Sequence, residues 1–249
     1  MLHHNSKVSK YILKTLNFIQ IVLRKFRDHV LPPENYVNPE QMFHKEEHLD
    51  SYNHFKKYFY TALFKKKYAL QTYCIKQAIE NFNSLKDNNY LFLEFGVFSG
   101  TSINLFSNEL KDLEIFGFDS FEGINEDWFG TSKEKGTFSM HGKLPKVNSN
   151  VNLIKGLVQD TLPNFLKDKT TKKIAFMHMD LDVYQSSKYV LEKTKPYLTK
   201  GSIILFDELY NYPGWSVGEY KALKEVFGDD EYKFIAFSSN GSGVAIEII

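Results

Sequence analysis

Length, composition and charge exclude several classes of protein. The chain has 249 residues, of which 43% are hydrophobic and 24% are charged, and its formal net charge is +1. This length suits one large α/β domain, or one such domain with an appendage. A near-neutral charge gives no electrostatic case for nucleic acid as a main partner. Cys74 is the single cysteine, which excludes an internal disulfide and a cysteine-rich zinc site, and we expect a reducing, cytoplasmic setting.

The first predicted element is an amphipathic helix over residues 7–30. Its apolar residues recur with helical spacing, and lysines and arginines lie between them. The segment is too short and too interrupted to span a bilayer, and it lacks the apolar core and cleavage site of a signal peptide. Two interpretations remain open. The helix packs against the domain or a partner subunit, which we favour, or it lies on a membrane surface.

The segment that follows is predicted to be helical as far as residue 82. Pro32 and Pro33 end the first helix, and the polar stretch to about Glu47 is typical of a connector. Residues 49–82 are predicted as two helices rich in Phe and Tyr, with a break at the lysines of residues 65–67. We interpret these lysines as a solvated face or turn rather than a binding patch. Residues 1–84 are thus a helical region for packing or oligomerisation.

The stretch Leu91–Ser102 has the layout of a nucleotide site. An apolar run, typical of a strand buried on both faces, breaks at Gly96 and Gly100 and passes through Thr101–Ser102 into an amphipathic segment. At the carboxyl edge of a parallel sheet, glycine lets the backbone approach a ligand, and Thr or Ser can cap the helix. Glu94 lies inside the apolar run. A buried carboxylate needs a partner, which a cationic group of a ligand would supply.

A second predicted strand strengthens this interpretation. Residues 115–119 form a short apolar strand that ends in Asp119, roughly 20 residues further on, where α/β nucleotide sites place a carboxylate for ribose hydroxyls. The glycine spacing is not Gly-x-Gly-x-x-Gly, so the dinucleotide fingerprint is absent. Residues 125–150 are irregular. Because long irregular segments in compact domains are often functional, we predict a lid over the site.

Two neighbouring predicted strands end in pairs of acids. Asp180 and Asp182 follow the strand at residues 174–179, and Asp207 with Glu208 follows the next strand. Right-handed crossovers place both strand ends at the same sheet edge, where the carboxylates would repel one another unless a cation neutralised them. Oxygen ligands suit Mg²⁺, Mn²⁺ or Ca²⁺ rather than zinc. The alternative is that each acid caps a helix or faces water.

Five short sequence blocks within residues 85–249 form an ordered series. They are Glu94–Val97 with Gly100 and Ser102, Phe118–Gly123, Gln159–Pro163, Met179–Ser186, and Gly201 with Phe206–Tyr210. The series resembles the macrocin O-methyltransferase family. Its members are S-adenosylmethionine- and metal-dependent enzymes that methylate sugar hydroxyls on macrolide and aminocoumarin antibiotics, with relatives in surface-polysaccharide clusters. The family usually has Asp-Asp-Tyr in the last block, whereas this chain has Asp207-Glu208-Leu209-Tyr210.

The resemblance implies a fold and a cofactor. The fold would be α/β, a Rossmann-like class I methyltransferase whose mostly parallel seven-stranded sheet has an antiparallel last strand, spanning residues 85–249 behind the N-terminal helices. Residues 233–238 and 243–249 fit the final antiparallel pair. The cofactor would be S-adenosylmethionine, held by Glu94, Gly96, Gly100, Thr101, Ser102, Asp119, Ser120, Gln159, Asp160 and Asp180.

The resemblance also implies how the site is divided among its residues. Glu94 and the turn at Gly96 would hold the methionine part of the cofactor, Asp119 the ribose, and Asp160 or its neighbours would lie near adenine. Asp180, Asp207 and Glu208 match the ligands of a Mg²⁺, Mn²⁺ or Ca²⁺ ion. Asp182 matches the general base. Because the second acid of the last block is Glu rather than Asp, the complete ligand set stays open.

The function we expect is metal-assisted O-methylation of a sugar hydroxyl. The acceptor would be a sugar-containing small molecule or glycan precursor, and the enzyme a homo-oligomer in the cytoplasm, or peripheral to the inner face of the membrane. Two alternatives stay open. A catechol or other phenol would chelate a metal equally well, and a non-catalytic binding module could keep the fold, although a module of that kind has no need of the acids.

Overall fold

The computed structural model describes residues 5–30, 38–82 and 89–249. By its internal contacts the chain divides into two units, Met1–Met42 and Phe43–Ile249. This division follows packing, whereas the predicted boundary at residues 84 and 85 followed the extent of the family resemblance. Each unit is described by itself.

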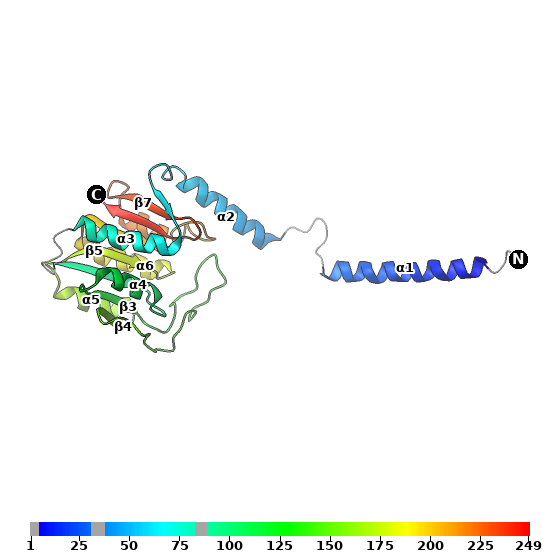
Figure 1. The fold of residues 1–249 in the computed structure, drawn as a ribbon, viewed down its shortest axis with the longest axis horizontal. Helices are drawn as coiled ribbons and strands as arrows, with labels where there is room; N and C mark the ends of the chain where they lie inside the picture. The colour runs from blue at the N-terminus through cyan, green and yellow to red at the C-terminus, as the bar shows by residue number, and fades with distance from the viewer. Residues whose placement is uncertain (1–4, 31–37, 83–88) are drawn as a thin grey trace. The chain divides into compact units, whose positions relative to one another are not determined.

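Helix α1 (Asn5–Val30) fills most of the first unit (Figure 1). It confirms the predicted amphipathic helix, and its sequence has no proline or glycine to interrupt it. The predicted end at Pro32–Pro33 lies outside the described residues. Among the helices that the structure describes, none combines the length and apolarity that crossing a bilayer requires.

Two predictions between residues 38 and 82 were wrong. The stretch predicted as a connector contains helix α2 (Pro39–Phe55), which begins with Asn38 as its cap. The Asn38 Oδ1 atom accepts the backbone N–H groups of Glu40 and Gln41 at 3.0 and 3.2 Å. An asparagine cap followed by proline at the first helical position is a favourable helix start.

The predicted break at the lysines contains a short strand as well as a turn. Strand β1 (Leu63–Lys65) precedes helix α3 (Lys67–Asn81), so the segment is not simply two helices. The strand is only three residues long and its residues are not buried, which explains why no alternation of apolar residues marked it in the sequence.

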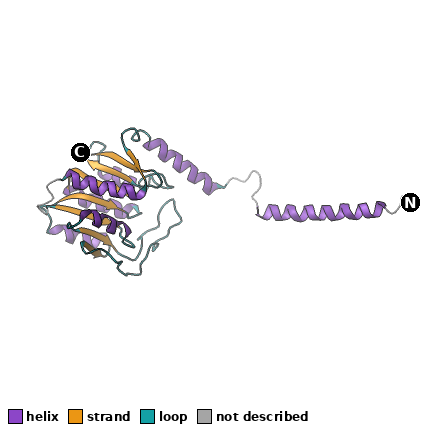
Figure 2. Ribbon diagram, viewed as in Figure 1, coloured by secondary structure: helices purple, strands orange, loops and turns teal. Residues whose placement is uncertain are grey.

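One mixed sheet organises the second unit (Figure 2). Its order is β1-β7-β8-β6-β5-β2-β3-β4, and β8 alone runs antiparallel to its neighbours. The Rossmann-like α/β fold with an antiparallel last strand is confirmed; the sheet has eight strands rather than seven, because β1 adds to β7 at the edge. The remaining strands are β2 (Tyr90–Phe95), β3 (Ile115–Asp119), β4 (Val151–Lys155), β5 (Lys173–Met179), β6 (Leu198–Phe206), β7 (Tyr232–Ser238) and β8 (Val244–Ile248).

Helices cover both faces of the sheet, so the central strands are apolar along their whole length. In β2, Leu91, Leu93 and Phe95 belong to one buried cluster and Phe92 to the other, as alternation across a strand requires. The first cluster includes residues of α5 (Val158–Lys167), α6 (Tyr184–Thr194) and α7 (Glu219–Val226). The second includes residues of α3 and α4 (Thr101–Leu110). A short 3-10 turn, η2 (Lys195–Tyr197), leads from α6 into β6.

The carboxyl ends of the central strands meet at one edge of the sheet. The Gly96 N–H donates to the Phe118 carbonyl at 2.9 Å, the Asp180 N–H to Phe95 at 2.8 Å, and the Asp207 N–H to Met179 at 2.9 Å. Residues 120–150, between β3 and β4, contain no helix or strand and form the long loop drawn in Figure 2. The irregular segment predicted as a lid is therefore a loop that starts at this edge.

Phe55, at the end of α2, tests whether this helix is part of the core. Its side chain is fully buried, with ring centroids 5.4 Å from Trp215 and 5.7 Å from both Tyr210 and Phe234. We expect Phe55→Ala to lower the free energy of unfolding by about 3–5 kcal/mol, because the cavity it leaves is lined by rings that cannot collapse into it. Urea unfolding measures this. Tyr60→Ala, at a side chain that is 91% exposed, is the control and should change it by less than about 0.5 kcal/mol.

Candidate functional site

A cavity of about 380 Å³ opens at the carboxyl edge of the sheet. It is bounded by the turn after β2, the start of the long loop, the start of α5, and the strand ends of β5 and β6. The predicted site residues that line it are Gly96, Asp119, Ser120, Gln159, Asp180, Asp182, Asp207 and Glu208. Glu94, Gly100, Thr101, Ser102 and Asp160 are not among the described residues that line it.

The turn after β2 is tight because Gly96 lies directly against the end of β5. Its φ is +90°, and a Cβ added there would be 1.7 Å from the backbone oxygen of Asp180. Asp119 fixes the same turn. Its Oδ2 accepts the N–H groups of Val97 and Phe98 at 2.8 and 2.7 Å, and its Oδ1 accepts that of Phe121 at 2.6 Å. The carboxylate predicted for ribose therefore also anchors the glycine turn.

Glu94 is fully buried beneath this turn and has partners within the chain. Its Oε1 accepts hydrogen bonds from the Ser102 hydroxyl and from His178 Nδ1, the latter at 3.0 Å. Its Oε2 has no hydrogen-bond partner among the described residues. Burial raises the pKa of Glu94, while His178 and Ser102 act against that rise. The cation beside this carboxylate in the structure is thus a histidine of β5.

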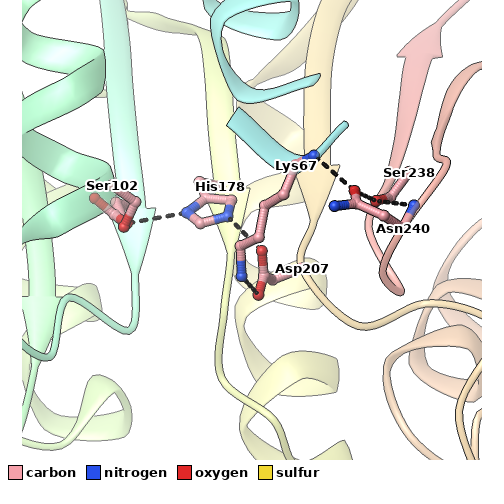
Figure 3. Close-up of polar contacts among 7 residues, drawn as sticks. Lys67, Ser102, His178, Asp207, Ser238 and Asn240 are labelled. Carbon is pink, nitrogen blue, oxygen red and sulfur yellow. Dashed lines mark hydrogen bonds and ion pairs between the residues drawn. The ribbon is translucent and has the colours of Figure 1, made fainter. Parts of the chain in front are cut away.

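His178 lies between Glu94 and the acidic edge, and Figure 3 shows its ring next to Asp207. Its Nε2 is 3.8 Å from Oδ1 of Asp207. Burial opposes the charge on the ring, but the carboxylates of Asp207 and Glu94 on its two sides raise the pKa of His178 to about 10. The raised pKa favours the charged form of the imidazole, which lies between two carboxylates at strand ends, although its Nε2 has no hydrogen-bond partner among the described residues.

Lys67, the first residue of α3, reaches the same edge from outside the sheet (Figure 3). Its Nζ donates to Asp207 Oδ2 at 2.6 Å, and its backbone N–H donates to Asn240 Oδ1 at 3.1 Å. Although burial opposes ionisation of Asp207, the nearby imidazole of His178 and the charge of Lys67 hold its pKa well below the usual range. Asp207 is therefore an ionised carboxylate with a cation on each side.

The other carboxylates of this edge are crowded together. Burial, and then the charge of Asp207, raises the pKa of Asp182 to about 7 and places those of Asp180 and Glu208 well above their usual ranges. Glu208 Oε2 is buried without a hydrogen-bond partner among the described residues. Crowded carboxylates of this kind lose protons readily only when a cation is added.

The arrangement of these acids fits a divalent cation. Possible ligand atoms within 4.8 Å of one another occur in two sets that share Asp180, one with His178 and Asp207 and one with Asp182 and Glu208. The three predicted ligands are therefore divided between the two sets. The set formed by Asp180, Asp182 and Glu208 offers oxygen atoms only, which suits Mg²⁺ or Mn²⁺, whereas the other set includes a histidine nitrogen.

The predicted residues outside the lining lie close behind it. Gly100 caps α4 with a φ of +81°, and Thr101 begins that helix. Asp160 is exposed in the first turn of α5, whereas Leu157, Val158 and Gln159 beside it line the cavity.

Three important residues were missed in the sequence. Lys67 was assigned to a solvated turn, yet it lines the cavity. His178 is the one polar residue between Ile174 and Met179, which is a signal that sequence reasoning could have used. Glu219, at the start of α7, is fully buried, and neither carboxylate oxygen has a hydrogen-bond partner among the described residues. Burial, and to a smaller extent the charges of Asp180 and Asp182, raises the pKa of Glu219 well above its usual range.

Comparison with known proteins shows which class of enzyme the chain resembles. Residues 93–209 match a family model described as a methyltransferase domain. Among curated proteins no match was found. Two solved structures titled for the calicheamicin methyltransferase CalS11 are each 27% identical to the chain and cover 70% of it, with TM-scores of 0.56 and 0.50. The alignments cover 77% and 78% of the two CalS11 chains.

The matched residues run from the strand that carries Glu94 to the acids that follow β6, so they span the cavity. The chain is an S-adenosylmethionine-dependent O-methyltransferase. The second CalS11 structure is titled as that of a TDP-rhamnose 3'-O-methyltransferase.

Replacing Gly96 tests how closely the turn and the end of β5 must approach. Gly96→Ala should weaken binding of S-adenosylhomocysteine by at least about tenfold, because a displaced turn no longer holds its ligand-facing groups in place. Gly136→Ala is the matched control: its φ is +88°, but an added Cβ would have nothing within 4 Å. It should show backbone strain of about 1–2 kcal/mol and unchanged affinity by calorimetry. Equal affinities in the two variants would contradict the close approach.

A double-mutant cycle tests the pairing of Glu94 with His178. His178→Leu should cost about 3–5 kcal/mol in urea unfolding, because it leaves a buried carboxylate without its cation. The double variant His178→Leu/Glu94→Leu should lose at least about 1 kcal/mol less free energy of unfolding than the sum of the losses in the two single variants. His178→Leu combined with the distant Phe55→Ala serves as the additive control. Additivity in the first pair would show that the two side chains are not coupled.

Proposed function

We propose that this methyltransferase transfers a methyl group to a hydroxyl of a sugar, with the help of a divalent metal ion. The observation that carries the proposal is that the acids after β5 and β6 line the same cavity as the glycine turn. A methyl donor and a metal-chelating acceptor would therefore meet in one space. The likeness to CalS11, titled as an enzyme that acts on a TDP-sugar, supports a sugar as the acceptor.

The residues of the turn would bind the cofactor. S-adenosylmethionine supplies an electrophilic methyl group on a sulfonium. Gly96 brings the backbone close to the cavity, and Asp119 holds the turn while it faces the same space. Leu157, Val158 and Gln159, at the start of α5, provide an apolar wall with one amide, which suits a nucleobase.

The acids would hold the metal and the acceptor. Of the predicted ligands Asp180, Asp207 and Glu208, the first and last would share one ion, since they belong to the set that also contains Asp182, whereas Asp207 belongs to the other set with Asp180. A divalent ion would offset their mutual repulsion and lower the pKa of a hydroxyl placed beside it. Asp182 lines the cavity from a turn with a φ of +64°, and we assign to it the role of general base that takes the hydroxyl proton.

The acceptor would lie under the long loop. Phe98, Ile124, Trp128 and Phe138 line the cavity with apolar surface, and Asn125 adds a polar group. Flat aromatic side chains with a few polar groups are suited to a ring that has one apolar face and several hydroxyls. The loop would thus determine which acceptor enters.

The direct test combines a binding assay with an acceptor screen. Purified protein is titrated with S-adenosylhomocysteine by calorimetry, and turnover is then measured on nucleotide sugars, free sugars and catechols, with Mg²⁺ and with a chelator. We expect a dissociation constant on the order of micromolar and Mg²⁺-dependent turnover on a sugar. A preference for catechols would overturn the sugar assignment. Full turnover in the chelator would overturn the metal.

Asp182→Asn separates the base from a metal ligand. If Asp182 is the base, this variant should lose about 10²–10⁴-fold in kcat while its affinities for S-adenosylhomocysteine and Mg²⁺ remain. Asp112→Asn, at an exposed residue in the turn after α4, is the control and should keep full activity. A loss of Mg²⁺ affinity in Asp182→Asn would instead make this residue a ligand, and unchanged turnover would exclude both roles.

A further inference from the structure

Helix α1 has an apolar stripe along one side. Ile12, Leu16, Ile19, Leu23 and Phe26 recur at steps of four and three residues, so they lie on one face, and each is between 46% and 66% exposed. The other exposed apolar residues of the helix are Tyr11, Leu13, Phe18, Ile21 and Val22, of which Ile21 lies on the side of the lysines by helical spacing. A continuous apolar face of this length is more than the single exposed side chains that ordinary surfaces carry.

The charges of α1 have one sign. Lys10, Lys14, Arg24 and Lys25 are exposed basic residues of the helix, and the sequence has no Asp or Glu between residues 5 and 27. The chain as a whole has a net charge of only +1, so the rest of it is net negative. By the spacing of a helix, the three lysines lie on the side away from the stripe. Positive charge is therefore concentrated on the element that carries the apolar face.

We propose that α1 binds to the surface of an anionic lipid bilayer. The stripe would enter the boundary between headgroups and acyl chains with the helix axis parallel to the surface, and the basic side chains would meet the lipid phosphates. The helix lacks the continuous apolarity that spanning requires. This inference concerns a surface apart from the cavity and does not rest on the acceptor assignment.

Charge decides between a membrane and a second copy of this helix. A second copy could cover the stripe, because steps of four and three residues also suit a coiled coil. It would, however, bring another basic helix with no acid between residues 5 and 27 to neutralise it. A pair of such helices would leave the positive charge of both copies without a counter-charge, whereas an anionic bilayer supplies the opposite charge along the whole helix.

Vesicle sedimentation with the full chain tests the proposal. The protein is mixed with vesicles of phosphatidylcholine alone, or with about 30% phosphatidylglycerol added. We expect the protein to sediment with the anionic vesicles. Its binding should be at least about tenfold weaker with the neutral vesicles, and also with the anionic vesicles in high salt. A triple variant K10E/K14E/K25E and an apolar variant L16E/I19E should each lose binding by at least about tenfold.

A matched control keeps the net charge the same. K146E/K167E/K200E changes three exposed lysines of the second unit and should bind vesicles like the unchanged chain. All variants are also titrated with S-adenosylhomocysteine, so that a folding defect or a failed cofactor assignment shows independently of vesicle binding. The proposal would be overturned if the control variant failed to sediment with anionic vesicles, or if the unchanged chain failed to do so. The proposal would also be overturned if light scattering showed that the unchanged chain is a dimer that does not bind vesicles, and that L16E/I19E separates this dimer. The stripe would then contact a second copy of the chain.

Discussion

The structure depends on burying a carboxylate in the middle of its sheet. Glu94 is fully buried, and an isolated charge there would be too costly to keep. Ser102 and His178 bond to one of its oxygens, and His178 turns toward Asp207 on the next strand. The carboxyl ends of β2, β5 and β6 and the start of α4 are thereby tied together where the backbone opens into the cavity. The chain of alternating charge fixes the edge at which the chemistry takes place.

The same chain explains how so many acids can share one edge. Asp207 keeps its charge because His178 and Lys67 lie on either side of it. Among the described residues no ion pair joins Asp180, Asp182 or Glu208 to a cation other than their neighbour His178, and burial together with the charge of Asp207 raises their pKa values. A divalent ion would lower them. The site thus combines one acid that is neutralised by the protein with three that the proposed ion would neutralise.

The second unit illustrates why some elements were predictable. The buried strands are continuous apolar runs, and the glycine turn follows directly from the need for close approach, since Gly96 leaves no room for a Cβ. The start of α2 was overlooked although Asn38 and Pro39 are a good helix start, because a mostly polar helix has no apolar period. Strand β1 had no signal, since an edge strand of three residues is specified by its pairing with β7.

The sequence by itself determined the fold class, the antiparallel last strand, the glycine turn, and the gathering of acids at one sheet edge. These features follow from local patterns and from the handedness of crossovers, which need no knowledge of distant contacts. Only the tertiary structure decided that Lys67 reaches Asp207, that His178 pairs with Glu94, and that Asp119 holds the turn as well as facing the cavity. Each of these pairs joins residues far apart in the chain. The position of one charge relative to another depends on packing, and no local pattern encodes it.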